Sequence, residues 1–189
     1  RSSETPSRMK KIHLILMLPV FLTGCAGLPS LDDRPESHYL DIRSAPRMDA
    51  LLNTATAKTG GDISNVYLLN DAHEAFVARA ALIEAADHTL DLQYYIWHND
   101  ISGKLMFNLI HRAAERGVRV RLLLDDNNTN GLDNVLLALD SHPNIEIRLF
   151  NPFVRRKWRA LGYLTDFPRL NRRMHNKSFT ADNRATILG

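Results

Sequence analysis

The chain has 189 residues, of which 44% are hydrophobic and 24% are charged. These values are those of an ordinary globular protein with a core, and a single domain is enough to account for the length. The formal net charge of +3 excludes a polycation. Any surface that binds anions must therefore come from local clustering of basic residues.

An extension, residues 1–8, precedes Met9, and two lysines then lead into an apolar run over residues 12–22. The run is too short to span a bilayer as a helix and is typical of the core of a secretory signal peptide, here residues 9–24. The letters LTGC that end at Cys25 resemble the lipobox of bacterial lipoproteins, in which the cysteine is acylated and becomes the first mature residue. Cys25 is therefore a candidate lipidation site. The alternatives are an ordinary signal peptide with an incidental cysteine, or a buried apolar helix.

Cys25 is the only cysteine of the chain, which excludes an intrachain disulfide and fits a thiol used for lipid attachment. Residues 26–65 contain scattered Ser, Asp and Pro with little apolar periodicity. We expect a partly disordered tether there, followed by a folded domain over residues 66–189.

Helical and strand patterns alternate through the expected domain. A helix is expected over residues 70–87, where Asp71 and Glu74 have the spacing of a capping box. The next expected elements follow in chain order: a strand (89–97), a helix with an apolar stripe over 105–114 that ends at Gly117, a strand (118–126), a helix (132–139) and a strand (145–150). This order predicts an α/β fold in which a mixed, mostly parallel sheet has helices on both faces.

Active groups in such sheets gather at the carboxyl ends of the strands. Asp125 and Asp126 lie at one such end, where they either form the turn or take part in catalysis. His98 follows the first expected strand, but no partners with the spacing of metal ligands cluster with it. The sequence predicts no metal site.

A basic segment follows the last expected strand of this series. Between Val154 and Lys177 the only acidic residue is Asp166. We interpret five basic residues of this segment as candidate ligands for the anionic head groups of phospholipids: Arg155, Arg156, Lys157, Arg172 and Arg173. The alternative is a solvated basic loop.

The clearest motif is HNKSFTAD, from His175 to Asp182. Of the eight histidines, only His175 has a lysine two residues later. Residues two apart in a strand project from the same face, so the imidazole and the ammonium of Lys177 are expected to act together. The imidazole can serve as a nucleophile or general base, and the ammonium supplies a fixed positive charge for phosphoryl oxygens. Asp182 lies in an expected hairpin turn before residues 185–188, where it either forms the turn or orients the site.

HxKxxxxD followed by a glycine, here Gly189, resembles the signature of the phospholipase D superfamily. Stretches such as LDLQYYIWHND and RGVRVRLLLDDNN are similar to its cardiolipin synthase branch, and the likeness runs from about Leu68 to Gly189. The resemblance implies a pseudo-symmetric α/β protein in which two such motifs meet at one active site. One histidine would form a phosphohistidine and the other would protonate the leaving alcohol. His175 would be one of the two, Lys177 would bind the oxyanion and Asp182 would support the site, with no cofactor.

We therefore expect an enzyme, a phosphatidyltransferase that makes cardiolipin from membrane phospholipids. It would be a lipoprotein of the bacterial cell envelope, with the outer membrane favoured because Ala26 follows Cys25. The alternatives are a phospholipase D-type hydrolase or nuclease, or a lipoprotein that binds phospholipid without turnover; nucleic acid is the less expected partner. The chain has one motif and ends at Gly189, so we expect an N-terminal fragment that is inactive alone, with the second motif in the missing part.

Overall fold

The computed structural model describes residues 28, 30–32, 34–56 and 64–189. The chain divides into two compact units, residues 1–35 and 36–189, and the second unit holds every helix and strand described below. The expected signal peptide and Cys25 lie outside the described residues. Within the described part, no helix combines the length and the apolar character needed to cross a membrane.

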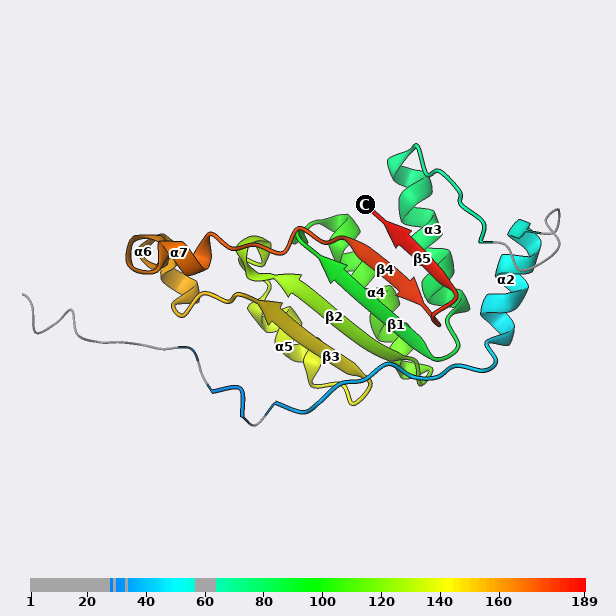
Figure 1. The fold of residues 1–189 in the computed structure, drawn as a ribbon, viewed down its shortest axis with the longest axis horizontal. Coiled ribbons are helices and arrows are strands. Elements are labelled where there is room, and N and C mark those ends of the chain that lie inside the picture. Colours follow the sequence, from blue (N-terminus) through cyan, green and yellow to red (C-terminus); the bar gives the residue numbers. More distant parts are fainter. Residues whose placement is uncertain (1–27, 29, 33, 57–63) are drawn as a thin grey trace, which may run out of the picture. The chain divides into compact units, whose positions relative to one another are not determined.

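A five-stranded sheet with the strand order β3-β2-β1-β4-β5 forms the centre of the second unit (Figure 1). β1 (Thr89–Tyr94), β2 (Arg119–Asp125) and β3 (Ile145–Phe150) run parallel to one another. β4 (Ser178–Ala181) runs antiparallel to β1, and β5 (Ala185–Leu188) runs antiparallel to β4. The predicted α/β fold with a mixed sheet is confirmed, and so is the predicted hairpin at the end of the chain.

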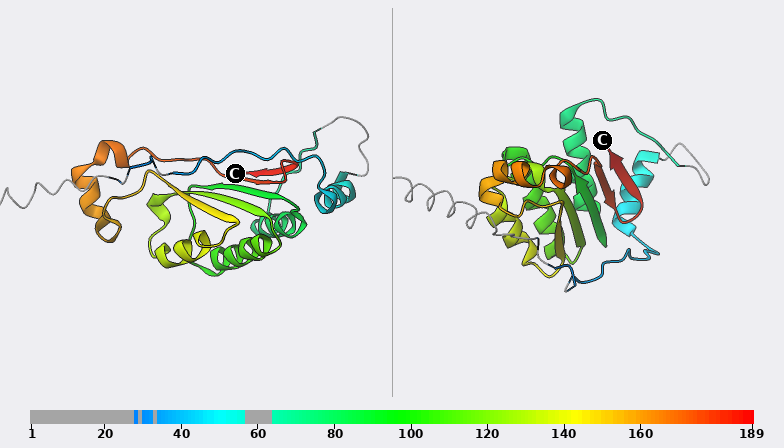
Figure 2. Two further views of the ribbon diagram at one scale, coloured as in Figure 1. Left: turned by 90° about the horizontal axis from the view of Figure 1, so that it is seen from below. Right: turned by 60° about the vertical axis from the view of Figure 1, so that its left-hand side comes forward.

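α3 (Ala72–Ala85), α4 (Ile101–Glu115) and α5 (Asp133–Asp140) all lie on the same face of the sheet (Figure 2). Alternate residues of the strands form the core beneath these helices, and its fully buried members include Leu90, Leu92, Val120, Leu122, Leu124 and Phe179. Helices were expected on both faces. The structure differs because the strands alternate apolar and polar residues, which suits a sheet with one covered face, whereas a sheet covered on both faces has nearly continuous apolar strands.

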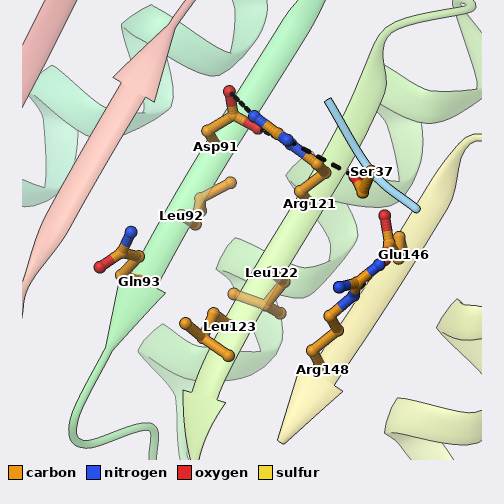
Figure 3. Close-up of a pocket in the computed structure, with 9 residues that line it drawn as sticks. All are labelled: Ser37, Asp91, Leu92, Gln93, Arg121, Leu122, Leu123, Glu146 and Arg148. Atoms are coloured by element: carbon orange, nitrogen blue, oxygen red, sulfur yellow. Dashed lines mark hydrogen bonds and ion pairs between the residues drawn. The ribbon is translucent and has the colours of Figure 1, made fainter. Parts of the chain in front are cut away.

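The opposite face of the sheet carries charged side chains (Figure 3). Arg121 of β2 donates from Nη2 to Asp91 Oδ2 of β1 at 2.8 Å, and Glu146 and Arg148 of β3 form an ion pair. With Ser37, these side chains line a shallow pocket of about 240 Å³. The polar face is thus held together by cross-strand and same-strand pairs in place of apolar packing.

The ends of two helices show how local sequence sets the elements. The side chain of Asp71 accepts the backbone N–H groups of His73 and Glu74 at the start of α3, as predicted for an N-cap. Glu74, expected to complete a capping box, instead accepts a hydrogen bond from the hydroxyl of Tyr67 at 2.6 Å. α4 ends close to Gly117, whose φ of +93° is a conformation that glycine adopts without steric cost.

The structure places the start of the domain earlier than the sequence predicted. Residues 26–65 were expected to form a tether, yet α2 (Pro46–Thr56) belongs to the second unit and Met48 is fully buried in the core. The backbone N–H of Arg47 donates to Asp87 Oδ2 at 2.8 Å, which joins α2 to the loop before β1. The apolar pattern of α2 is weak in the sequence, so the helix depends on its packing against α3.

Candidate active site

His175 and Lys177 lie in the extended segment that leads into β4. The pair was expected to lie within a strand. β4 begins at Ser178, so the pair lies just before the strand. Ser178 pairs with Gln93 near the end of β1, and the two strands are antiparallel. The segment therefore lies at the edge of the sheet where β1, β2 and β3 end, which is where active groups of parallel sheets gather.

The side chain of His175 is exposed and lies against an aromatic ring. The ring centroids of His175 and Tyr95 are 4.6 Å apart, with an angle of 53° between the ring planes. Tyr95 directly follows β1, the strand that pairs with β4. The structure shows no hydrogen bond from either ring nitrogen of His175 to a described residue. The tyrosine can therefore restrict the imidazole while both nitrogens stay available to a substrate.

Lys177 lies close to the backbone of His175. Its Nζ donates to the main-chain oxygen of His175 at 3.2 Å. The main-chain oxygen of Lys177 accepts the N–H of Gly189 at 3.1 Å, which ties the segment to the end of β5. One imidazole and one fixed cation thus share an edge. That arrangement can attack a phosphodiester and balance the negative charge that develops on its oxygens.

Asp182 lies at the opposite end of β4 from His175 and is fully buried. Its carboxylate accepts the backbone N–H groups of Asp87 at 2.7 Å, His88 at 2.7 Å and Thr89 at 2.8 Å. Its φ of +49° places it in the turn between β4 and β5. Asp182 therefore forms the turn and also fixes the start of β1 to the hairpin. Any influence on His175 must pass along β4 or along β1, which leads to Tyr95.

Asp125 fixes the backbone directly before His175. It is buried at the end of β2, where Oδ2 accepts the N–H of Met174 at 2.8 Å and Oδ1 accepts from Arg173 Nη1 at 3.1 Å. A buried carboxylate is tolerated only when it is paired and hydrogen-bonded, and these two partners supply both conditions. Asp125 therefore acts as a positioning residue for the histidine.

Asp126 holds the start of the basic segment. It is fully buried, and Oδ2 accepts the N–H of Phe153 at 2.8 Å. Its Oδ1 forms ion pairs with Arg156 and Arg159. Burial lowers the pKa of the Arg159 guanidinium, and the nearby Asp126 carboxylate acts in the opposite direction. The segment is thus attached to the domain by charges that are themselves largely removed from water.

The five basic residues predicted to bind head groups fall into two sets. Arg156 is held by Asp126 and Arg173 by Asp125, so both guanidinium groups serve the fold of the segment. The other three are exposed, and the structure shows no ion pair between them and a described residue: Arg155, Lys157 and Arg172. Binding of phospholipid stays a prediction, and only this second set is open to an external anion.

Two features of the site were missed from the sequence. Tyr95 lay inside the strand expected over residues 89–97 and was given no role of its own, whereas β1 ends at Tyr94. The clamps formed by Asp125 and Asp126 were also missed, because their partners lie far along the chain. In the described part of the chain, no three His, Cys, Asp or Glu side chains come close enough to hold a metal ion. His98, considered earlier as a ligand, accordingly has no such cluster around it.

Comparison with known proteins adds to this geometry. Residues 80–189 match the family model described as "Cardiolipin synthase, PLD-like domain". Cardiolipin synthase C of Escherichia coli strain K12 is 63% identical over 124 residues, which are 66% of this chain and 26% of that protein. An uncharacterized protein of Helicobacter pylori is 36% identical over 184 residues, which are 95% of this chain and 36% of that protein. This chain therefore spans only 26–36% of the length of these two relatives.

Solved structures are also similar, and the following is one of them. NucT from Helicobacter pylori is 20% identical, with a TM-score of 0.42, and the match covers 62% of this chain and 65% of that chain.

Proposed function

This chain belongs to the phospholipase D-like cardiolipin synthase family, and on that premise we propose that the intact protein is a phosphatidyltransferase that joins phospholipids into cardiolipin. The observation that carries the proposal is the exposed imidazole of His175 at the sheet edge, together with the ammonium of Lys177, which donates to the main-chain oxygen of the same histidine. A second HxKxxxxD motif, supplied by a part of the protein outside this chain, would complete the site.

The proposed reaction has two steps. In the first, one motif histidine attacks the phosphorus of a phospholipid, the bond to the head-group alcohol breaks, and the other motif histidine protonates that alcohol. In the second, a hydroxyl of a second phospholipid attacks the phosphorus of the phosphohistidine, the P–N bond breaks to release the histidine, and the proton of the hydroxyl passes to the same acid–base group. Lys177 balances the charge on the non-bridging oxygens in both steps. Water in place of the lipid hydroxyl would give hydrolysis, the alternative activity.

The test is made on the intact protein with phosphatidylglycerol, with and without a second phospholipid, in the presence of a strong chelator. His175→Asn should lower the rate of cardiolipin formation by roughly a thousandfold or more, because nothing nearby replaces the imidazole. Lys177→Ala should be nearly as damaging. His98→Asn, which changes an exposed histidine outside the motif, is the matched control and should leave the rate unchanged. Activity that survives His175→Asn, or that disappears on chelation, would refute the proposal.

We further propose that Cys25 anchors the protein to the bacterial envelope, with the outer membrane as the favoured site. The support is the sequence LTGC behind a short apolar run. Mass spectrometry of the protein expressed from Met9 should show a lipid-modified cysteine at the new N-terminus. An unmodified Cys25, or cleavage at another residue, would contradict this.

A further inference from the structure

The segment between β3 and β4 presents exposed apolar side chains at the edge that holds His175. It folds into η3 (Arg156–Trp158), α6 (Arg159–Thr165) and α7 (Phe167–Leu170), which extend beyond the ends of the parallel strands (Figures 1 and 2). Four of its large apolar side chains, here called the α6 surface, are exposed to these extents: Trp158 66%, Leu161 44%, Leu164 82% and Phe167 55%. Apolar side chains gathered in this way on a soluble protein commonly mark a site of interaction.

The orientation of α6 is fixed by its other face, which packs on the domain. A Cβ added at Gly162 would lie 3.0 Å from a Leu170 methyl group and 3.3 Å from the ring of Phe153. The ring of Tyr163 meets that of Phe153 with centroids 5.4 Å apart, and its hydroxyl donates to Asn127 at 2.7 Å. Turning α6 to bury its leucines would break these contacts. The α6 surface therefore faces outward because the inner face is already packed.

Unpaired cations lie on the same segment as the α6 surface. Arg155, Lys157 and Arg172 are exposed, and no described carboxylate pairs with them. By contrast, Arg169 is paired with Asp166. Tryptophan favours the head-group region of a bilayer, leucine and phenylalanine enter the acyl boundary, and exposed Arg and Lys attract anionic lipids. The combination has the chemistry of an element that inserts shallowly into an anionic membrane.

We propose that the α6 surface docks the protein on an anionic phospholipid bilayer and holds His175 against it. The proposal rests on the proposed function, for which the bilayer supplies the substrate. The segment is connected to the sheet edge by the two clamps, which are the hydrogen bonds that Asp126 and Asp125 accept at its two ends. Asp126 holds Phe153 and Asp125 holds Met174, the residue before His175. Docking of the segment therefore fixes the distance between the sheet edge and the lipid.

The binding experiment uses the intact protein with Cys25→Ser, which removes any lipid anchor, and vesicles with or without phosphatidylglycerol in phosphatidylcholine. Trp158 serves as a reporter because it is exposed, whereas Trp97 is 7% exposed. The difference in emission between this protein and its Trp158→Phe variant isolates the signal. Vesicles that contain phosphatidylglycerol should shift that emission to shorter wavelengths, because the indole leaves water.

Variants separate the apolar and the charged contributions. Leu164→Asp should weaken vesicle binding at least tenfold, because it places a charge where an apolar side chain enters the interface. Replacing Arg155 and Lys157 with glutamine should weaken binding roughly fivefold for each charge, with a larger effect at low salt. Two controls carry matched changes elsewhere: Leu137→Asp on α5, where Leu137 is 72% exposed, and Lys104→Gln on α4. Both should bind as the parent does.

Three results would overturn docking by the α6 surface. One is vesicle binding that is unchanged by Leu164→Asp, or that is weakened to the same extent by Leu137→Asp. Another is a Trp158 already shielded from acrylamide without vesicles, which would mean that another part of the protein covers the surface. The third is tighter binding to duplex DNA than to vesicles. The rate of phospholipid turnover is measured separately with phospholipid dispersed in detergent. Leu164→Asp should retain this turnover, because no bilayer is needed. Turnover by His175→Asn would refute the proposed function without changing the conclusion from vesicle binding.

Discussion

Replacing Asp182 with alanine should destabilise the domain far more than its place in a surface turn suggests. The carboxylate is fully buried and accepts three backbone N–H groups at 2.7–2.8 Å. Hydrogen bonds to a charged group contribute about 1.5–3 kcal/mol each, so three of them set an upper bound of about 5–9 kcal/mol. Water will reach some of the exposed donors in the variant. We therefore expect a loss of about 3–5 kcal/mol in the free energy of unfolding, the range for removing one partner of a buried charged group.

Asn183→Ala is the matched control, because Asn183 occupies the same turn with a φ of +53° and is exposed. Both alanines bear the cost of a left-handed backbone, roughly 1–2 kcal/mol. Asn183→Ala also removes the hydrogen bond from Asn183 Nδ2 to the main-chain oxygen of Leu40, so the difference between the variants is a lower bound on the contribution of the carboxylate. The free energy is measured by urea unfolding at neutral pH. Equal destabilisation by the two variants would refute the reasoning. An Asp182→Asn protein that keeps wild-type stability but loses turnover would instead favour an orienting role over a structural one.

Two further predictions concern the ring beside His175 and the cap of α3. Tyr95→Phe should keep most of the activity, because the ring that contacts His175 is retained. Tyr95→Ala should lower kcat about tenfold or more with little change in KM, because a mobile imidazole loses its alignment. Equal kcat values for the two variants would contradict this. The backbone N–H groups of Glu74 and His73 lower the pKa of Asp71 below 3.8. Ionised Asp71 therefore stabilises the folded state above that pH, and the difference in unfolding free energy between wild type and Asp71→Ala should shrink as the pH falls through the lowered pKa; a difference that grows on acidification would show the wrong sign.

The elements with a strong local pattern were predictable from the sequence. β3 has the predicted bounds, and α4 ends close to Gly117, because apolar periodicity and a glycine that permits positive φ act over a few neighbouring residues. β1 was expected to continue to Trp97 but ends at Tyr94. Trp97 instead stacks on Phe107 of α4, with ring centroids 4.5 Å apart. Trp97 is therefore apolar because it packs on a helix, and it was wrongly interpreted from the sequence as part of the strand.

The candidate site was predictable only in part, for a similar reason. His175 and Lys177 were found because their spacing is a local property of the chain. Asp125 and Asp126 do form a local turn, in which Asp125 accepts the N–H of Asn127 and Asp126 accepts a hydrogen bond from the hydroxyl of Thr129. Their distant partners come from residues 153–174, so no local pattern could show that the same carboxylates also hold that segment. The same nonlocal pairing divides the arginines of the basic segment into held and exposed sets, which their sequence does not reveal.

The two clamps also bear on how this protein can change over evolution. The segment from Phe153 to Met174 is held at both ends by adjacent residues of the chain. Asp126 accepts the N–H of Phe153, and Asp125 accepts the N–H of Met174. The entropic cost of closing a flexible loop grows only slowly with its length. A lineage that keeps the arginines paired with Asp126 and Asp125 can therefore lengthen, shorten or exchange the rest of the stretch between the clamps while the backbone before His175 stays in register. Recognition of the surroundings can diversify there without a matching change in the chemistry.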